Sequence, residues 1–242
     1  MDITLVGPGR AGMALALAAR EAGHVVSGVL GSSTAATESA AVAVGAAPLL
    51  AGESLGSGDL LVIAVRDSQI REVADRVASR TGGFGAAVHL SGLAPVASLA
   101  SIEAAGPDIG SFHPLQTLPT AEAGAARLSG AWIGITANDP LRRVLHSFGD
   151  SLGAQPFDLP DDAKALYHAA AAAAANFPLA MLTMAHDLFR SAGVPFEAAR
   201  PLVEAVVANA FELGPRAALT LSLIHISEPT RPNAPSRMTS SA

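Results

Sequence analysis

The sequence has no cysteine, few aromatic residues and little positive charge, and each shortage excludes a class of function. Without cysteine, its 242 residues cannot form disulfides, thiolate metal sites or cysteine nucleophiles, and this composition fits a cytoplasmic protein. Aromatic residues make up 4% of the chain, so alanine, valine and leucine must build the core. The net charge is −6 and no basic block occurs. We therefore expect neither nucleic acid nor an anionic membrane surface as a partner.

Half of the residues are hydrophobic, which is enough for a sizeable core. Two apolar stretches could be mistaken for a signal peptide or a membrane segment. Residues 1–20 carry Asp2 where a signal peptide would carry lysines, and glycines interrupt the run. Residues 167–185 consist largely of alanine, which is only weakly apolar, and contain His168, Asn176 and Pro178. We expect neither stretch to be a membrane segment.

Strand-like and helical stretches alternate through the first two thirds of the chain. Apolar runs at residues 2–6, 24–30, 59–65, 86–92 and 131–136 predict strands, and residues 10–23 and 69–80 have helical composition. A small polar loop is expected at 31–36. The nearly continuous apolar run at 59–65 is typical of a parallel strand covered on both faces. The alternation predicts an α/β fold with a doubly wound sheet.

From Pro160 onward the pattern is entirely helical, and Pro160 followed by Asp161 and Asp162 is a favourable helix start. We expect an α/β domain over residues 1–157 and an all-α domain over residues 158–220. The run of alanines at 169–175 permits close helix approach, so it favours helix packing or a dimer interface over chemistry.

Three glycines with the spacing G-x-G-x-x-G follow the first predicted strand and open the first predicted helix. Gly7 permits the tight turn, Gly9 lets the backbone approach a pyrophosphate, and Gly12 lets helix pack on strand. Backbone N–H groups at a helix start hold such an anion. The motif predicts a Rossmann domain that binds a dinucleotide, the alternative being a merely structural turn. The expected contacts also include Pro8, Arg10 and Ala11.

The end of the second predicted strand bears on which dinucleotide binds. An acidic residue there would bind the ribose 2′-hydroxyl and favour NAD, but residues 31–34 read Gly-Ser-Ser-Thr. Ser32 and Ser33, with Arg10, could hold a 2′-phosphate. We expect NADP rather than NAD, unless the serines only form a turn and Arg10 is solvated.

The carboxyl ends of the strands in a doubly wound sheet carry the ligand-binding residues. His113 and Ser91 end two strand-like runs and should face the nicotinamide, and Asp67, after the strand that ends at Val65, could lie near the cofactor ribose. Imidazole can transfer a proton at neutral pH beside a developing alkoxide. His113 is therefore the first candidate for proton transfer. The alternatives are a histidine that only hydrogen bonds to backbone and an Asp67 that only caps the next helix.

The helical part offers a second group of candidates. Lys164 and His168 are four residues apart, so they share one helix face, and Asn176 follows two turns later. Lys164 could bind a substrate carboxylate or donate a proton, with His168 and Asn176 orienting the substrate. The alternatives are a solvated lysine near a helix start and a histidine that only packs.

Two other chemistries are disfavoured. The seven histidines are scattered without carboxylates at coordination spacing, so no metal site is expected. Ser91 lacks the G-x-S-x-G elbow of serine hydrolases.

Four blocks, VGPGRAG, HLSG, GSFHPLQT and KALYHAAAAAAANF, occur in one order across residues 2–220. Together they resemble Rossmann-like oxidoreductases that carry a C-terminal helical domain of unknown function of the 2520 series. That family is similar to deazaflavin-dependent NADP oxidoreductases and, more distantly, to 6-phosphogluconate and prephenate dehydrogenases. The resemblance implies an NADP-type Rossmann domain, a helical domain used for dimerisation, and a cleft between them. In prephenate dehydrogenases the histidine of the similar His-Pro block contacts the reacting hydroxyl, and the matching position is His113.

One departure concerns the helical block. Many 3-hydroxyacid dehydrogenases pair a lysine with an asparagine four residues later, whereas the residue four positions after Lys164 is His168. The lysine's role therefore does not transfer directly.

These observations predict an oxidoreductase that transfers a hydride between nicotinamide and a small, anionic oxo- or hydroxy-acid. An imine or ketopantoate-like reductase is the alternative enzyme. A sensor or scaffold that binds NADP without turnover is the alternative from another class.

The last 22 residues, 221–242, differ in character from the rest. Leu221–Arg231 can be back-translated into the common transposase sequencing adapter, and the final SRMTSSA differs by one residue from a reading frame of the flow-cell end that follows it. We expect this stretch to be read-through of library DNA and the helical domain to be incomplete. The alternative is a disordered tail rich in proline and serine.

Overall fold

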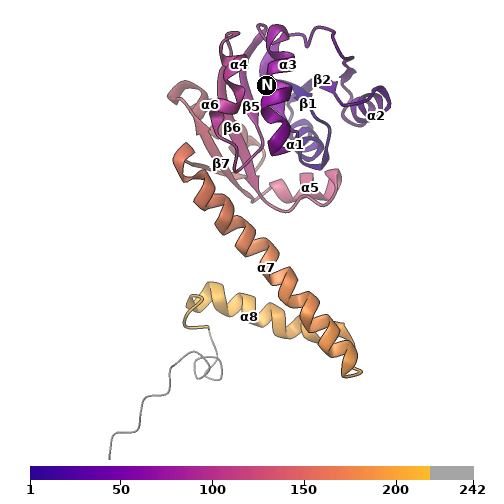
Figure 1. Ribbon diagram of the computed structural model, residues 1–242, viewed down its shortest axis with the longest axis vertical. Coiled ribbons are helices and arrows are strands. Elements are labelled where there is room, and N and C mark those ends of the chain that lie inside the picture. The colour runs from indigo at the N-terminus through magenta and orange to yellow at the C-terminus, as the bar shows by residue number, and fades with distance from the viewer. Residues whose placement is uncertain (219–242) are drawn as a thin grey trace, which may run out of the picture. The chain divides into compact units, whose positions relative to one another are not determined.

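The computed structural model describes residues 1–218, so the read-through hypothesis for residues 221–242 lies outside the described residues. The chain divides into two compact units, Met1–Phe177 and the part that begins at Pro178. Figure 1 shows the elements of each unit, and we describe the two units separately.

The first unit is built on one eight-stranded sheet with the order β3-β2-β1-β4-β5-β6-β7-β8. All neighbouring strands are parallel except β6 and β7, which pair antiparallel. The strands are β1 (Asp2–Val6), β2 (Val25–Leu30), β3 (Ala47–Pro48), β4 (Gly58–Ile63), β5 (Phe84–His89), β6 (Asp108–Leu115), β7 (Trp132–Ala137) and β8 (Gln155–Asp158).

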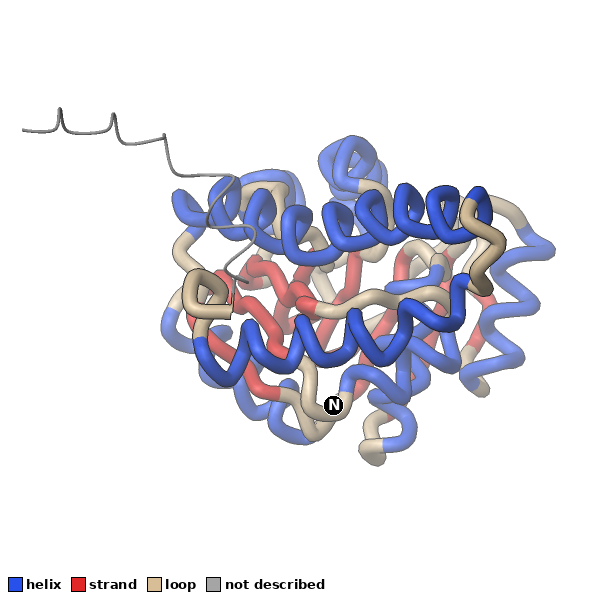
Figure 2. Tube along the Cα trace, turned by 90° about the horizontal axis from the view of Figure 1, so that it is seen from below, coloured by secondary structure: helices blue, strands red, loops and turns tan. Residues whose placement is uncertain are grey.

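Helices cover both faces of this sheet, as Figures 1 and 2 show. One face packs on α1 (Arg10–Glu21), α2 (Thr34–Val44), α5 (Ala121–Leu128) and α6 (Asp139–Ser151). The other face packs on α3 (Ile70–Val77) and α4 (Ala100–Glu103), with the short 3-10 turns η1 (Asp67–Gln69), η2 (Ala78–Arg80) and η3 (Val96–Leu99). The α/β fold with a doubly wound sheet, predicted from the sequence, is confirmed.

The strand order gives the sheet a switch point between β1 and β4. The chain leaves β1 toward β2 on one side and returns to β4 on the other, so the loops after β1 and β4 diverge. Ligands of such sheets bind at this point, outside the carboxyl ends of the strands. The residues that follow β1, β4, β5 and β6 therefore define the edge at which a site is expected.

Three features of this unit were not predicted from the sequence. Residues 34–36, expected to be loop, form the first turn of α2, because Ser33 caps that helix and Thr37 is hydrogen bonded back to it. Strand β7 runs antiparallel, which no local pattern encodes. The compact unit also continues past residue 157 to Phe177, because the start of α7 packs within it.

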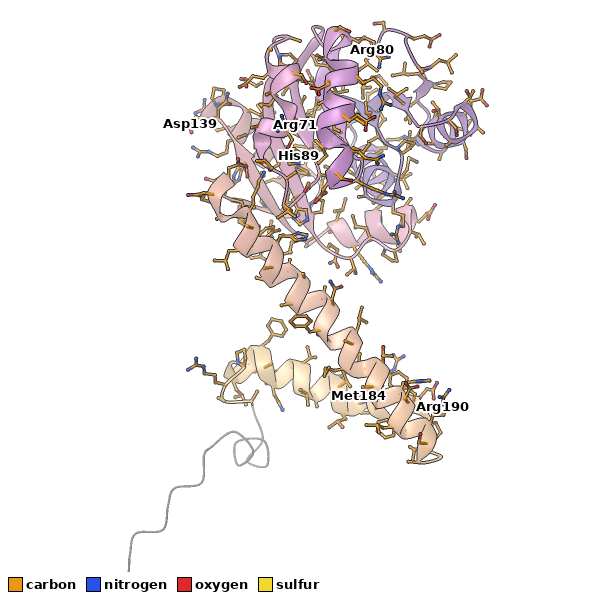
Figure 3. All side chains as sticks on the ribbon, in the orientation of Figure 1. Arg71, Arg80, His89, Asp139, Met184 and Arg190 are labelled. Atoms are coloured by element: carbon orange, nitrogen blue, oxygen red, sulfur yellow. The ribbon has the colours of Figure 1, made fainter. Side chains whose placement is uncertain are left out.

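The helical part comprises η4 (Asp161–Ala163), α7 (Lys164–Ser191), η5 (Phe196–Ala199) and α8 (Arg200–Leu213). The boundary between the units falls inside α7 at Pro178, which has no N–H to donate to the carbonyl one turn earlier. Large apolar side chains in the second unit are exposed: Leu179, Met181, Met184 and Leu188 on α7, and Leu202, Val206 and Phe211 on α8. Figure 3 labels Met184 on this half of α7.

The segment Asp161–Ser191 is also long and apolar enough to cross a membrane, judged by length and composition alone. Its first turn, however, buries Lys164 to 1% exposure within the folded first unit.

Candidate active site

The turn after β1 has the geometry that the glycine spacing predicts. Gly7 adopts φ +95°, and a Cβ placed on it would lie 2.6 Å from the carbonyl oxygen of Ala64. A Cβ on Gly12 would lie 2.6 Å from the carbonyl oxygen of Gly7 and 2.8 Å from Cβ of Ala64. Both positions therefore require glycine, the first for its backbone conformation and the second for the close packing of α1 on the sheet.

Gly9 differs from its two neighbours in the motif. A Cβ on Gly9 would meet no heavy atom within 4 Å, so its outer side is open. Gly9 is the residue before the first turn of α1, and that turn contains no acidic residue. The first N–H groups of an α-helix have no partner within the helix, and here they lie beside this open backbone. The loop thus fits a diphosphate, which would lie against Gly9 and accept hydrogen bonds from the N-terminus of α1.

The loop after β2 is fixed by hydrogen bonds of its own hydroxyl groups. Ser33 caps α2 by accepting a hydrogen bond from the N–H of Ala36, at 3.3 Å. Thr37 donates to the carbonyl of Ser33 at 2.8 Å and accepts from the N–H of Gly31 at 2.9 Å. Ser32 is exposed, and its hydroxyl makes no hydrogen bond within residues 1–218. No carboxylate lies at the end of β2 or in the first turn of α2.

The next two strand ends place the other predicted cofactor contacts. Val65 packs against the glycine turn, its Cγ1 only 2.8 Å from a Cβ built on Gly7. Asp67 opens η1, is exposed, and forms no side-chain hydrogen bond to the described residues. Ser91 follows β5 and is buried, and its hydroxyl oxygen accepts from the N–H groups of Leu93 and Ala94. Ser91 therefore shapes the loop after β5 as well as lining the edge.

His113 lies at the carboxyl end of β6, beyond the part of that strand that pairs with β5. The pairing of β5 with β6 ends where His89 lies opposite Ser111, two residues before His113. Its Nδ1 lies 2.8 Å from the hydroxyl oxygen of Tyr167. Its Nε2 makes no hydrogen bond within the described part of the chain. One ring nitrogen is thus held by Tyr167, and the other has no partner among the described residues.

Two residues around His113 were not singled out as site residues from the sequence. Tyr167 contacts the imidazole both through its hydroxyl and edge-on, with ring centroids 5.5 Å apart. Gly92 lies against the ring, since a Cβ built on it would fall 2.7 Å from Cε1 of His113. Both contacts join residues far apart in sequence, so local pattern could not predict them. The Tyr-His pair inside the KALYH block is the signal that could have pointed to Tyr167.

The three predicted residues of α7 lie in different surroundings. His168 is half-buried and close enough to His113 for its charge to act on that ring. Asn176 is exposed and makes no side-chain hydrogen bond among the described residues. Lys164 is 1% exposed, and its ammonium donates to the carbonyl of Ala94 at 2.9 Å and pairs with Asp161 at 3.0 Å. It is therefore not the solvated lysine that its position near a helix start suggested, and its proton-bearing nitrogen is already engaged by the protein.

Burial and neighbouring positive charge keep two histidines neutral. Burial lowers the pKa of His113 to about 4, and the charges of His168 and Lys164 act in the same direction. Burial and then the charge of Lys164 lower the pKa of His89 to about 4. Figure 3 labels His89 within the sheet. Asp67 opposes both shifts, which places its carboxylate near this edge. Burial also raises the pKa of Tyr167 to about 12, so its hydroxyl stays protonated.

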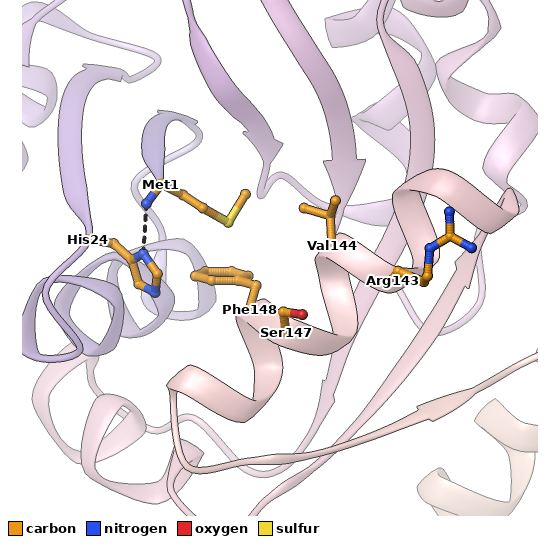
Figure 4. Close-up of a pocket in the computed structure, with 6 residues that line it drawn as sticks. All are labelled: Met1, His24, Arg143, Val144, Ser147 and Phe148. Carbon is orange, nitrogen blue, oxygen red and sulfur yellow. Dashed lines mark hydrogen bonds between the residues drawn. The ribbon is translucent and has the colours of Figure 1, made fainter.

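A depression elsewhere in this unit contains none of the residues predicted to bind a cofactor or substrate. It has a volume of about 330 Å³ and is lined by Met1, His24, Arg143, Val144, Ser147 and Phe148 (Figure 4). Met1 and His24 precede β1 and β2, so it lies at the amino ends of the strands, opposite the edge described above. The amino group of Met1 forms a hydrogen bond with Nδ1 of His24 at 2.9 Å. Within residues 1–218 no group of His, Asp or Glu side chains could hold a metal ion.

Comparison with protein families agrees with the resemblance read from the sequence. A Rossmann-like domain model matches residues 1–114, and the model described as a domain of unknown function, DUF2520, matches residues 131–221. No match was found among curated proteins.

Solved structures share the fold at low sequence identity. A Bacteroides fragilis protein whose name proposes it as an NADP oxidoreductase is 23% identical, with a TM-score of 0.78 over 93% of this chain and 86% of its own. An imine reductase from Streptomyces aurantiacus is 17% identical, with a TM-score of 0.68 over 94% and 79%. Prephenate dehydrogenase from Aquifex aeolicus is 13% identical, with a TM-score of 0.60 over 78% and 71%. At these identities the likeness shows the fold.

The low pKa of His89 predicts a pH dependence of stability. The folded pKa of about 4 lies below the unfolded value of 6.5, so between these values the unfolded chain binds more protons. The contribution of neutral His89 to the free energy of unfolding is complete above pH 6.5 and is lost as the pH falls to 4. For this fully buried ring it is on the order of 3 kcal/mol. In urea unfolding at pH 7 and pH 4.5, we expect His89→Gln to lose less stability between the two pH values than the unsubstituted protein.

The exposed His186 provides the control. His186→Gln should follow the unsubstituted protein at both pH values, because its ring is exposed in the folded state. An equal loss of stability for His89→Gln and the unsubstituted protein would contradict the assignment of the pH dependence to His89.

Proposed function

We propose that this chain, which joins a Rossmann-like domain to a DUF2520 domain, is an NADP-dependent oxidoreductase. It would transfer a hydride between the nicotinamide and a small oxo- or hydroxy-compound. The observation that carries the proposal is the placement of two features at one edge of the sheet. The open backbone at Gly9 follows β1, and the imidazole of His113 lies at the end of β6.

The strand order supports a continuous site between these two features. Strands β1, β4, β5 and β6 are successive neighbours, which separates the ends of β1 and β6 by ~15 Å at the usual strand spacing. Val65, Asp67, Ser91 and Gly92 follow the two strands in between. A dinucleotide anchored at α1 and extended across this edge would bring its nicotinamide toward His113.

The roles of the chain's own groups follow from this placement. When bound, the nicotinamide supplies the hydride or accepts it. In the oxidising direction, Nε2 of His113 would accept the substrate hydroxyl proton as the hydride leaves the neighbouring carbon. In the reducing direction, a proton held on Nε2 would pass to the carbonyl oxygen. The neutral state of His113 at pH 7 suits the first of these steps.

For the nucleotide, we propose NADP rather than NAD. A carboxylate that could bind a ribose 2′-hydroxyl is missing from the end of β2 and the first turn of α2. The exposed Ser32, the N-terminus of α2 and the exposed Arg10 offer donors and positive charge to a 2′-phosphate instead.

The expected negative charge of the substrate has weaker support. It relied on Lys164, whose ammonium is held by Ala94 and Asp161. His168, beside His113, is the remaining group on α7 that could meet a carboxylate or orient an uncharged substrate. Asn176 would take part only with a substrate that extends along α7.

Reduction of an imine is the second candidate activity. It is favoured by the shared fold of the Streptomyces aurantiacus imine reductase and of a pyrroline-5-carboxylate reductase from Coxiella burnetii. The two activities differ in the acceptor atom, carbonyl oxygen or imine nitrogen, and the same edge of the sheet would serve either.

We also propose that the chain forms a homodimer through its helical part and works in the cytoplasm. The exposed apolar side chains of α7 and α8 support the dimer, because large unpartnered apolar surfaces are uncommon on soluble monomers. The use of a pyridine nucleotide and the absence of cysteine fit the cytoplasm.

Nucleotide binding is tested by Gly9→Ala. Its Cβ would meet nothing within 4 Å and Gly9 has φ −77°, so the fold should be unchanged. The same Cβ stands where the diphosphate would approach, and we expect NADPH affinity to fall ~10-fold or more in calorimetry, at an unchanged melting temperature. Equal NADPH affinity in Gly9→Ala would contradict a diphosphate at this turn.

Nucleotide preference is tested by Ser32→Asp. The new carboxylate would repel a 2′-phosphate and could accept hydrogen bonds from a 2′-hydroxyl. We expect weaker binding of NADPH and unchanged or stronger binding of NADH, so that the ratio of the two dissociation constants reverses. A ratio that favours NADH before the substitution would overturn the proposed preference.

Turnover is tested by His113→Ala in an NADPH oxidation assay with a panel of 2-oxoacids and cyclic imines. Loss of the proton-transferring group should lower turnover by ~10²-fold or more and leave NADPH affinity unchanged. His146→Ala, at the surface of α6, should retain full activity. Equal activity of His113→Ala would remove His113 from its role. NADPH binding without oxidation on any substrate would favour a sensor or scaffold.

A further inference from the structure

The start of α7 is held to the loop after β5 by an ion pair between the buried Lys164 and the exposed Asp161. Nζ of Lys164 donates to the carbonyl oxygen of Ala94 at 2.9 Å and lies 3.0 Å from Oδ1 of Asp161. The same Oδ1 accepts a hydrogen bond from the N–H of Val96 at 3.1 Å. A buried ammonium is costly unless it is fully partnered, so the lysine is held where these partners lie. We call Lys164 and Asp161 the strap.

The loop that the strap holds is itself fixed and covers His113. Ser91 accepts hydrogen bonds from the N–H groups of Leu93 and Ala94, and its own N–H donates to Nδ1 of His89. Gly92, inside this turn, lies so close to the imidazole that a Cβ on it would fall within 2.9 Å of Cε1, Nδ1 and Nε2 of His113. The loop therefore limits where the imidazole plane can lie.

Tyr167 approaches the same imidazole from the strapped helix. It lies three residues after Lys164, about one turn along α7. Its ring meets the rings of His113 and Phe157 edge-on, with centroids 5.5 Å and 6.0 Å away. These contacts place its hydroxyl 2.8 Å from Nδ1 of His113. The tyrosine is the single one in the sequence, so this hydroxyl is the chain's sole phenol.

We propose that Tyr167 is a positioning residue that holds the proton of neutral His113 on Nδ1, and that the Lys164–Asp161 strap holds Tyr167 in place. In the proposed tautomer the Nδ1–H donates to the hydroxyl oxygen of Tyr167, and Nε2 keeps its lone pair for the substrate. This inference builds on the proposed function, since it says which nitrogen of His113 exchanges a proton with substrate. It also makes Lys164 a positioning residue rather than a proton donor.

The proton balance of the step is simple. In the oxidising direction the hydroxyl proton forms a bond to Nε2 while the hydride leaves with its electron pair for the nicotinamide, and His113 becomes imidazolium. The imidazolium then releases the Nε2 proton to solvent and keeps the Nδ1 proton. The reducing direction reverses these transfers. An imidazole with its proton on Nε2 could not accept the hydroxyl proton there, so the tautomer decides whether the step is possible.

The proposal is tested by nitrogen NMR of the free protein labelled with ¹⁵N-histidine, at pH 7, where His113 is neutral. His113→Asn identifies its resonances by their disappearance. We expect a protonated Nδ1 and an unprotonated Nε2 for His113. In Tyr167→Phe, which keeps the ring and removes only the hydroxyl, we expect this pattern to be lost in favour of a mixture of tautomers. His186→Gln, which leaves Tyr167 and its ring contacts with His113 and Phe157 unchanged, should retain it.

Lys164→Met tests the strap with the same readout. Removing the ammonium should release Tyr167, so the His113 resonances should change toward those of Tyr167→Phe. A protonated Nε2 in the unsubstituted protein, or an unchanged pattern in Tyr167→Phe, would overturn the role of Tyr167. An unchanged pattern in Lys164→Met would overturn the role of the strap. These outcomes need no substrate or nucleotide, so they are distinct from a failure of the proposed function, which would appear as absent NADPH binding.

In the turnover assay, Tyr167→Phe should lower the rate about 10-fold or more while leaving the dissociation constant of NADPH unchanged. A rate equal to that of the unsubstituted protein would contradict the positioning role.

Discussion

The close packing of α1 on the end of β1 is the constraint on which the site depends. Gly7 and Gly12 leave no room for side chains, so the helix starts directly beside the sheet edge. That start brings unpaired N–H groups to the switch point, and Gly9 leaves the space in front of them open. The remaining features of the site extend along the same edge, from the end of β4 to the end of β6.

The surroundings of His113, at the end of β6, form the second constraint. His113 is neither a free surface imidazole nor a buried core histidine. It is covered on one side by the backbone at Gly92 and hydrogen bonded at Nδ1 to Tyr167, while Nε2 has no partner among the described residues. The groups that achieve this come from the loop after β5 and from α7, and Lys164 joins those two segments. Separating the two segments would leave this buried charge without its partners, which is strongly destabilising, so the lysine holds them together.

Much of the fold and part of the site could be predicted because their signals are local. The strands β1, β2, β4, β5 and β7 are short apolar runs, and the glycine spacing encodes a turn and a helix start within a few residues. His113 could be proposed as a site residue because it ends such a run. The direction of β7 was not predictable, since pairing direction depends on the whole chain path.

The surroundings of the site could not be predicted for a related reason. Helical spacing shows that Lys164 and His168 share a face, but it does not show how deeply that face is buried, so Lys164 was expected to meet solvent or substrate. Gly92 and Tyr167 acquire their roles only when segments 21 and 54 residues away in the sequence meet His113. The helix α2 was missed because hydroxyl-rich residues look like a loop until their capping bonds are seen.

The proposed site requires that a dinucleotide anchored at the N-terminus of α1 reaches His113 with its nicotinamide. A crystal structure of the protein with NADP⁺ would show whether it does. We expect a diphosphate against Gly9 and the nicotinamide within a substrate's width, roughly 4–6 Å, of Nε2 of His113, close enough for one reacting group to touch both. A nucleotide bound elsewhere, such as the depression between Met1 and Arg143, or a nicotinamide turned away from His113, would contradict it.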